Sequence, residues 1–351
     1  MMKLLLGGVV ILFVVLLAGF WMWRKMTGPL YQPGDVRAGK DLAEPLTPPQ
    51  TSGTRWLVAP NIELHHFEEG AGTPVLVVHG GPGFPTTQPW RAGKLLTGYR
   101  TIYYHQRGCG LSTRPIRSFS GSNMYANMRK VHQTLGLPAQ IGDIERIRRI
   151  LGVERLIVIG HSFGAELAAL WAAEFPEHVR ALVCVAPADL AVLPPKDDSG
   201  NLFELVRQRL PAKLKPEYER YLAEYFDFRR AFARSEEESS AFYGRLGKYW
   251  GAGGAPRGPS AIDAAGYEPL GVYCSMGAHH DYRGAFAAVQ APVLVIHGGT
   301  DLQPESVSRN FAARFANHRT VRIDNASHFV FDDQPEAFAA AVNQFLGGLQ
   351  P

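Results

Sequence analysis

A short serine motif between two glycines limits the folds open to this chain more than any other feature. Residues 156–159 read Leu-Ile-Val-Ile, a run typical of a buried strand, and residues 166–173 continue as an apolar helical run. Between them lies Gly-His-Ser-Phe-Gly at 160–164. So sharp a turn from strand to helix crowds the backbone, and Gly160 and Gly164 remove the Cβ atoms that would collide there. The motif predicts that Ser162 stands at the exposed tip of the turn as a nucleophile.

A second glycine-rich turn follows another apolar strand, which we expect at 74–78. The turn reads His-Gly-Gly-Pro-Gly at 79–83. Glycines at the carboxyl end of a strand let backbone N–H groups approach a bound ligand closely. When such a turn precedes a serine elbow, it can supply the second donor to an oxyanion. We therefore predict an oxyanion hole made by the N–H groups of Gly81 and Phe163, each typically worth about 3 kcal/mol in the transition state.

Strand-like and helix-like runs alternate over 54–188 and again over 284–351. This alternation predicts an α/β core with a mostly parallel, doubly wound sheet. From 189 to 283 the alternation stops, and residues 202–232 show helical spacing that includes Tyr218, Tyr221 and Tyr225. We expect residues 189–283 to form a helical cap that is inserted into the core, covers the active site and shapes the substrate pocket.

The elbow also predicts where an acid and a base should lie, since its partners follow in the order serine, acid, histidine on loops after the last strands. Asp301 and His328 occupy those places. His328 would take the proton of Ser162 and pass it to the leaving group, and Asp301 would orient the imidazole and stabilise the imidazolium. Asp189, after the strand that follows the elbow, is an alternative acid. Three other histidines at strand ends are alternative bases that more often serve in packing: His79, His161 and His297.

Four motifs together resemble the proline iminopeptidase group of α/β-hydrolases. They are H-G-G-P-G at 79–83, Q-R-G-C-G-L-S at 106–112, D-I-E-R at 143–146 and G-x-S-x-G at 160–164. The resemblance covers about 54–188 and 291–349, and it implies an α/β-hydrolase fold and release of N-terminal proline from short peptides. Two positions depart from the group. His105 stands where the group usually has Asp, and the elbow reads G-H-S-F-G, a form commoner among esterases, instead of G-G-S-W-G.

The resemblance therefore predicts a proline iminopeptidase-type aminopeptidase first, and one alternative stays open. An aminopeptidase needs a negative charge in the cap to pair with the free amine of its substrate. The cap has four candidate acids, none in the aromatic context that the group uses: Glu204, Asp263, Glu268 and Asp281. The alternative is a membrane-anchored carboxylesterase, or another α/β-hydrolase, that acts on small esters.

The amino-terminal region contains a run of 20 residues without a charge, at 4–23. A helix of that length would span about 30 Å, the thickness of a bilayer's hydrocarbon core. We expect a transmembrane helix over 1–25, a Pro- and Gly-rich linker over 26–53 and a single-pass membrane localisation. A cleaved signal peptide is the alternative, but the run exceeds the usual apolar core of such peptides and no clear cleavage site follows. Basic residues flank the run on both sides, so the side of the membrane stays open.

Composition narrows the partners further. The net charge is +4 with no block of basic residues, which argues against nucleic acid. The three cysteines, Cys109, Cys184 and Cys274, are too scattered for a disulfide framework, and no metal-ligand spacing occurs, so no metal is expected. A serine triad with backbone donors needs no cofactor, and none is expected. The expected partners are a small-molecule or short-peptide substrate and, through the first helix, a membrane.

Overall fold

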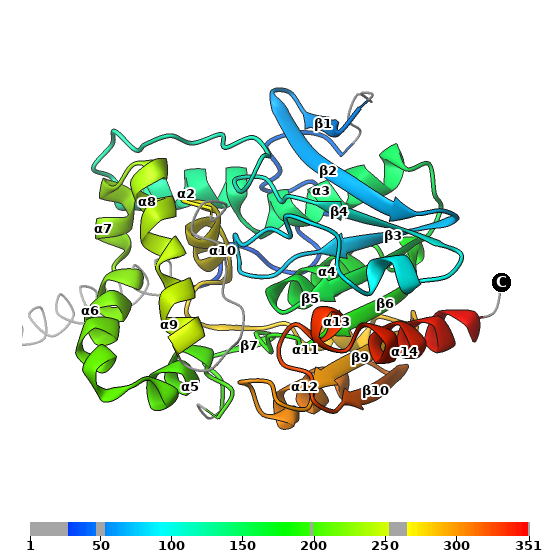
Figure 1. Ribbon diagram of the computed structural model, residues 1–351. Coiled ribbons are helices and arrows are strands. Elements are labelled where there is room, and N and C mark those ends of the chain that lie inside the picture. Colours follow the sequence, from blue (N-terminus) through cyan, green and yellow to red (C-terminus); the bar gives the residue numbers. More distant parts are fainter. Residues whose placement is uncertain (1–26, 47–52, 197–198, 253–264, 350–351) are drawn as a thin grey trace, which may run out of the picture.

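A twisted eight-stranded sheet forms the centre of the protein (Figure 1). The computed structural model describes residues 27–46, 53–196, 199–252 and 265–349. The strand order is β1-β2-β4-β3-β5-β6-β9-β10. The strands are β1 (Arg55–Ala59), β2 (Ile62–Gly70), β3 (Thr73–Val78), β4 (Tyr99–Tyr104), β5 (Leu156–His161), β6 (Val179–Val185), β9 (Val293–Gly298) and β10 (His318–Ile323). The β1–β2 and β2–β4 pairs are antiparallel and the pairs from β4 to β10 are parallel, as the alternation predicts.

The central strands are mostly apolar because both faces of the sheet are covered. Successive side chains of a strand point to opposite faces, and the buried residues divide accordingly. Leu76 and Val158 join one core cluster, with α3 (Leu137–Ile150), α4 (Phe163–Glu174) and α12 (Glu305–Ala312). Val77 and Ile159 join the other, with α13 (Val330–Asp333) and α14 (Pro335–Gly347). Continuous apolar runs are what a doubly covered parallel sheet requires.

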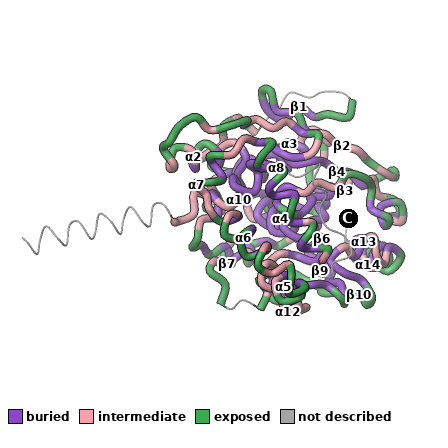
Figure 2. The backbone as a smooth tube through the Cα atoms, turned by 60° about the vertical axis from the view of Figure 1, so that its left-hand side comes forward, coloured by how far each residue is buried: buried purple, intermediate pink, exposed green. Residues whose placement is uncertain are grey.

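Helix α4 lies at the centre of this packing. It follows the serine elbow directly and contacts β5, α3 and α11 (Arg283–Ala287). Nearly all of its residues are buried (Figure 2). A helix that is apolar all round is stable only when it is enclosed on every side. The elbow is therefore held between a buried strand and a buried helix.

A group of helices lies between β6 and β9 in the sequence and forms a lobe beside the sheet, at the left of Figure 1. The helices are α5 (Leu202–Arg209), α6 (Lys215–Tyr225), α7 (Phe228–Ala233), α8 (Glu236–Gly244), α9 (Leu246–Ala252) and α10 (Glu268–Met276). Helices α5, α6, α8 and α9 share an aromatic core, to which Tyr218, Tyr221 and Tyr249 belong. Helix α7 packs with α10 in a neighbouring cluster. Helix α10 also packs against α2 (Met124–Leu135), which ties the lobe to the main body. We refer to this lobe as the cap.

Residues 27–46 belong to the stretch that we expected to be a linker, but they pack closely on the core. Tyr31 and Val36 are fully buried in the core cluster around α4. The carboxylate of Glu174, near the end of α4, accepts hydrogen bonds from the Tyr31 hydroxyl (2.9 Å) and from the N–H groups of Gly34 (2.8 Å) and Arg37 (2.9 Å). These contacts make the segment part of the domain instead of a free spacer.

The prediction of a membrane-spanning helix is corrected. The longest described helix, α3, has 14 residues and so a length of about 21 Å, well short of the ~30 Å of a bilayer core. Among the described residues, no helix is both long enough and apolar enough to cross a membrane. Residues 1–25, for which the anchor was predicted, lie outside the described residues. We therefore assign the α/β core and the cap to the fold, and we retain neither the transmembrane helix nor the membrane as a partner and location.

Candidate active site

The strand-to-helix turn at Ser162 has the strained backbone that the motif predicts. Ser162 has φ 55° and ψ −122°, a conformation that non-glycine residues rarely adopt. A Cβ atom at Gly160 would lie 2.4 Å from the carbonyl oxygen of Gly164, and one at Gly164 would lie 2.1 Å from the carbonyl oxygen of Val78. Neither position can hold a side chain unless the strand and the helix separate. The N–H of Ser162 donates to the carbonyl oxygen of Val185 at 2.9 Å, which fixes the turn to β6.

The glycine-rich turn at 79–83 lies directly against this elbow. A Cβ atom at Gly80 would come within 2.8 Å of the Cβ of Ser162. Gly81 has φ +124°, which L side chains rarely adopt, so a glycine is needed there. Gly81 and Phe163, the two predicted donors, line the same cavity as Ser162.

His79 braces the glycine-rich turn. Its Nδ1–H donates to the carbonyl oxygen of Gly80 (2.9 Å), and its Nε2 accepts from the N–H of Gln106 (3.0 Å). Burial lowers the pKa of His79 to about 3, so the ring is neutral at physiological pH. With both nitrogens engaged, His79 holds the turn in place and is not available as a base.

The predicted acid and base are in direct contact. Nδ1–H of His328, on the loop after β10, donates to Oδ2 of Asp301 at 2.9 Å and lies 3.2 Å from Oδ1. Asp301, on the loop after β9, also accepts the N–H of Gln303 at 3.1 Å. Burial acts to raise the pKa of Asp301, but the adjacent His328 and these hydrogen bonds outweigh it and leave the pKa below its usual value. The carboxyl group is therefore an anion that fixes the orientation of the His328 ring.

The alternative acid, Asp189, has a different partner. Both of its carboxylate oxygens lie 2.6 Å from Nη2 of Arg314. Although Asp189 lines the cavity, His328 is paired with Asp301. Of the two candidate acids, the structure brings only Asp301 to the histidine.

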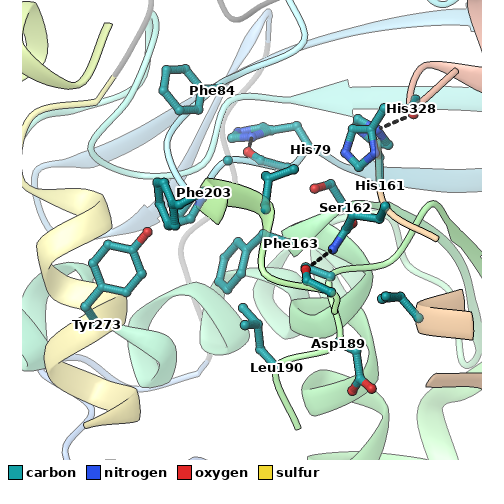
Figure 3. Close-up of a pocket in the computed structure, with 18 of the residues that line it drawn as sticks. His79, Phe84, His161, Ser162, Phe163, Asp189, Leu190, Phe203, Tyr273 and His328 are labelled. Carbon is teal, nitrogen blue, oxygen red and sulfur yellow. Dashed lines mark hydrogen bonds between the residues drawn. The ribbon is translucent and has the colours of Figure 1, made fainter. Parts of the chain in front are cut away.

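Two contacts of His328 were not anticipated as parts of the site. Nε2–H of His161, the residue before the serine, donates to the carbonyl oxygen of His328 at 2.9 Å. Burial lowers the pKa of His161 to about 3, so this bond persists across the physiological pH range. Trp250 belongs to the cap, and the centroid of its ring lies 5.3 Å from that of His328. Figure 3 shows His161, Ser162 and His328 together on one side of the pocket.

These residues open into one large cavity of about 1740 Å³ between the core and the cap. Small-molecule sites typically measure ~300–1,000 Å³, so this cavity can hold an extended substrate. Ser162, Phe163 and His328 form its floor on the side of the core. Aromatic side chains make up much of the remaining wall: Phe84, Phe203, Tyr225, Phe226, Trp250 and Tyr273.

The charges along this cavity are mostly positive. Of the described residues that line it, the acidic ones are Asp189 and Asp332. Asp189 is paired with Arg314, and Asp332 accepts the N–H of Arg91 at 2.8 Å. The basic lining residues are Arg91, Lys196, Arg283 and Arg314.

The acids proposed from the sequence as amine partners lie elsewhere. Glu204 accepts from Nε of Arg207 at 2.7 Å, and Asp281 accepts from Nε of Arg283 at 2.9 Å. Glu268 is fully buried, and burial raises its pKa to about 8. None of these three described acids lines the cavity. Asp263 lies outside the described residues.

Two of the sequence motifs pair with each other behind the site. Arg107 belongs to the Q-R-G motif and Asp143 to the D-I-E-R motif. Nε and Nη2 of Arg107 each donate to one carboxylate oxygen of Asp143 at 2.6 Å, and both side chains are fully buried. His105, the departure beside Q-R-G, accepts from the N–H of Leu111 (2.9 Å) and donates to the carbonyl oxygen of Thr86 (3.1 Å). Burial lowers the pKa of His105 to about 4. It therefore acts as a neutral brace between loops.

The described residues offer no group of three or more His, Cys, Asp or Glu side chains placed to hold a metal ion. The three cysteines are buried and unpaired.

Comparison with known proteins agrees with this arrangement. Residues 73–335 match the family model described as the alpha/beta hydrolase fold. The proline iminopeptidase of Heyndrickxia coagulans is 23% identical over 304 residues, which cover 82% of this chain and 96% of that protein. The solved proline iminopeptidase of Mycobacterium smegmatis superposes with a TM-score of 0.52 at 20% identity, over 82% of this chain and 95% of its own. An esterase from Exiguobacterium antarcticum gives a TM-score of 0.54 at 17% identity, over 85% of this chain and 100% of the esterase.

The resemblance to proline iminopeptidases that the four motifs indicate is thereby confirmed. The solved structures, all of low identity, support the fold alone.

Proposed function

Because the chain belongs to the alpha/beta hydrolase fold family, we propose that it is a serine hydrolase whose triad is Ser162, His328 and Asp301. The observation that carries the proposal is the buried His328–Asp301 hydrogen bond at the cavity into which the Ser162 elbow opens. An imidazole oriented by an anion, at the same cavity as a serine in a strained turn, is the arrangement that activates a hydroxyl nucleophile.

The reaction proceeds in two halves. Oγ of Ser162 attacks the substrate carbonyl carbon while His328 takes the hydroxyl proton, and the oxyanion receives the N–H groups of Gly81 and Phe163. The tetrahedral intermediate collapses, the bond to the leaving group breaks, and His328 gives its proton to that group. Water then attacks the acyl-enzyme, with His328 again as base, and releases the acid and free Ser162. His161 holds the loop of His328 throughout.

The lining of the cavity favours esters with an apolar acyl group. An aminopeptidase must desolvate the charged amine of its substrate, which is costly unless a carboxylate receives it. The two described acids of the cavity wall already have partners, and four basic residues line it. An uncharged ester has no such desolvation cost, and burial of its apolar acyl group against the aromatic wall is favourable.

An aminopeptidase that releases N-terminal proline is the second candidate. It is favoured by the four motifs and by the similarity to the Heyndrickxia coagulans proline iminopeptidase over nearly the whole of that protein.

The test compares p-nitrophenyl butyrate with proline p-nitroanilide. We expect rapid hydrolysis of the ester and little of the anilide. Ser162→Ala should abolish turnover, whereas Ser122→Ala, at an exposed serine on a loop, should leave it unchanged. Full activity in Ser162→Ala would refute the triad. Efficient cleavage of the anilide with little ester hydrolysis would replace the first substrate class by the second.

A further inference from the structure

Two tyrosines of the cap meet inside the cavity. Tyr225 ends α6 and Tyr273 lies in α10, and both line the cavity. Their hydroxyl groups are 2.8 Å apart and hydrogen-bonded to each other. Figure 3 shows Tyr273 across the pocket from Ser162, with its hydroxyl directed toward Phe203. The pair therefore lies at the end of the cavity remote from the reacting serine.

The pair has one more proton than its mutual hydrogen bond uses. Each hydroxyl carries one proton, and one of the two occupies the bond between them. Burial raises the pKa of Tyr273 to about 12 and that of Tyr225 well above its usual value, so both groups stay protonated. Within the described residues, this bond is the one hydrogen bond that either hydroxyl makes. A donor is thus left over in surroundings formed by aromatic rings such as Phe203, whose centroid lies 5.1 Å from that of Tyr225.

The position of His328 determines which part of a substrate reaches the tyrosines. The leaving group must lie beside His328, because His328 supplies its proton. His328 and Tyr273, to which Tyr225 is hydrogen-bonded, lie on opposite sides of Ser162 (Figure 3). The acyl group, which remains on Ser162, therefore extends toward Phe84, Phe203 and the tyrosine pair.

We infer that the Tyr225–Tyr273 pair is a specificity site that donates a hydrogen bond to an oxygen at the far end of an aromatic acyl group. This inference rests on the proposed function and narrows it to esters of arylalkanoic acids that carry an ether, hydroxyl or carbonyl oxygen on the ring. Aromatic walls favour a flat ring. A buried donor discriminates strongly against an analogue that lacks the acceptor, because the donor is then left without a partner.

The experiment uses two esters that differ at one atom. They are the p-nitrophenyl esters of 3-(4-methoxyphenyl)propanoic acid and 3-(4-ethylphenyl)propanoic acid, which have nearly the same shape, but only the first has an acceptor. We expect the intact protein to prefer the methoxy ester by about 3- to 10-fold in kcat/KM. The double variant Tyr225→Phe/Tyr273→Phe should lower this ratio to about one.

Tyr221→Phe is the matched control. Tyr221 lies one helical turn before Tyr225, its buried hydroxyl has no partner among the described residues, and it does not line the cavity. Its removal should leave the ratio unchanged. A ratio near one in the intact protein, or a preference that survives the double substitution, would overturn the inference.

A binding measurement separates this inference from the proposed function. Calorimetry with Ser162→Ala gives the Kd ratio of the two esters without turnover, and the same 3- to 10-fold preference is expected. If the intact protein hydrolyses neither ester, the proposed function fails, and the Kd ratio still decides whether the tyrosine pair recognises the oxygen.

Discussion

The stability of this protein should pass through a maximum near pH 6.5, because two sets of buried groups titrate in opposite directions. The first set is the four buried histidines whose pKa values are lowered most, chiefly by burial. The pKa is about 3 for His79 and His161 and about 4 for His105 and His132. These rings stay neutral in the folded protein, whereas in the unfolded chain they bind protons below pH ~6.5. Their contribution is complete above pH 6.5 and is lost as the pH falls toward 4 and 3.

The second set is the two buried glutamates whose pKa values are raised most. Burial raises the pKa of Glu268 to about 8 and that of Glu166 well above its usual value. Both are protonated in the folded protein at neutral pH, whereas in the unfolded chain they ionise above pH ~4.5. Their contribution is complete below pH 4.5 and is lost as the pH rises, and for Glu268 this loss extends to about pH 8.

The magnitude follows from counting protons. Counting these six groups alone, the unfolded chain binds four histidine protons between pH 4.5 and 6.5 and the folded protein binds two glutamate protons, so unfolding takes up a net two. At ~1.4 kcal/mol per proton and pH unit, stability should fall by about 3 kcal/mol for each pH unit of acidification. Of these six groups, only the two glutamates differ in protonation between the folded and unfolded states above pH 6.5, so stability should fall at about the same rate up to pH ~8.

The assay is urea unfolding, followed by circular dichroism from pH 4.5 to 8.5 at constant ionic strength. Glu268→Gln retains the neutral form and should roughly halve the decline above pH 6.5. Glu154→Gln, at an exposed glutamate, is the control and should leave the profile unchanged. A free energy of unfolding that is flat over this range, or that rises steadily from pH 6 to 8, would refute the reasoning.

Three further predictions concern the elbow, the acid and the cap. Gly164→Ala should destabilise the fold by about 3 kcal/mol or more in urea unfolding, because its Cβ would lie 2.1 Å from a β3 carbonyl oxygen. Gly284→Ala, in α11 with no neighbour within 4 Å, should be neutral or stabilising by up to ~1 kcal/mol. Asp301→Asn should lower kcat on p-nitrophenyl butyrate by about 1,000- to 10,000-fold, and Asp189→Asn should have little effect on kcat; equal losses would contradict the assignment. Trp250→Leu should lower kcat about 5- to 10-fold, because an aromatic face near the base stabilises the imidazolium, and Trp250→Phe should keep most of the activity; equal losses in both would contradict this role.

The core elements could be predicted because their signals are local. The apolar run at 156–159 became β5 and the run at 74–78 became β3, since a strand covered on both faces has no polar positions to interrupt it. The elbow could be predicted because two glycines and a serine within five residues are compatible with few backbone conformations. Chain order alone indicated that Asp301 and His328 should meet, and they do, at 2.9 Å.

Contacts between distant residues left no such signal. His161 was predicted as a packing residue, and its bond to the carbonyl oxygen of His328 spans 167 positions in the sequence. The Pro- and Gly-rich stretch before the core was predicted as a linker because its composition is that of a spacer. The segment is attached to the core through Glu174, which lies 140 positions beyond Gly34. The Glu174 carboxylate accepts the hydrogen bonds that the segment donates. Such contacts form only in the folded chain, where the sheet brings residues that are distant in the sequence next to each other.

The cap shows why substrate choice is harder to predict from a sequence than reaction chemistry. Helical spacing placed Tyr221 and Tyr225 in one pattern, one turn apart, with nothing to distinguish them. In the structure, Tyr221 is enclosed within the cap, whereas the hydroxyl of Tyr225 meets Tyr273 at the cavity wall. The difference is made by Tyr273 of α10, which lies 48 positions beyond Tyr225 and forms a hydrogen bond with its hydroxyl. The family resemblance implies an acid in the cap, and a single charged residue can be identified in a sequence. The recognition chemistry of the tyrosine pair depends instead on how two helices pack, and no single residue indicates it.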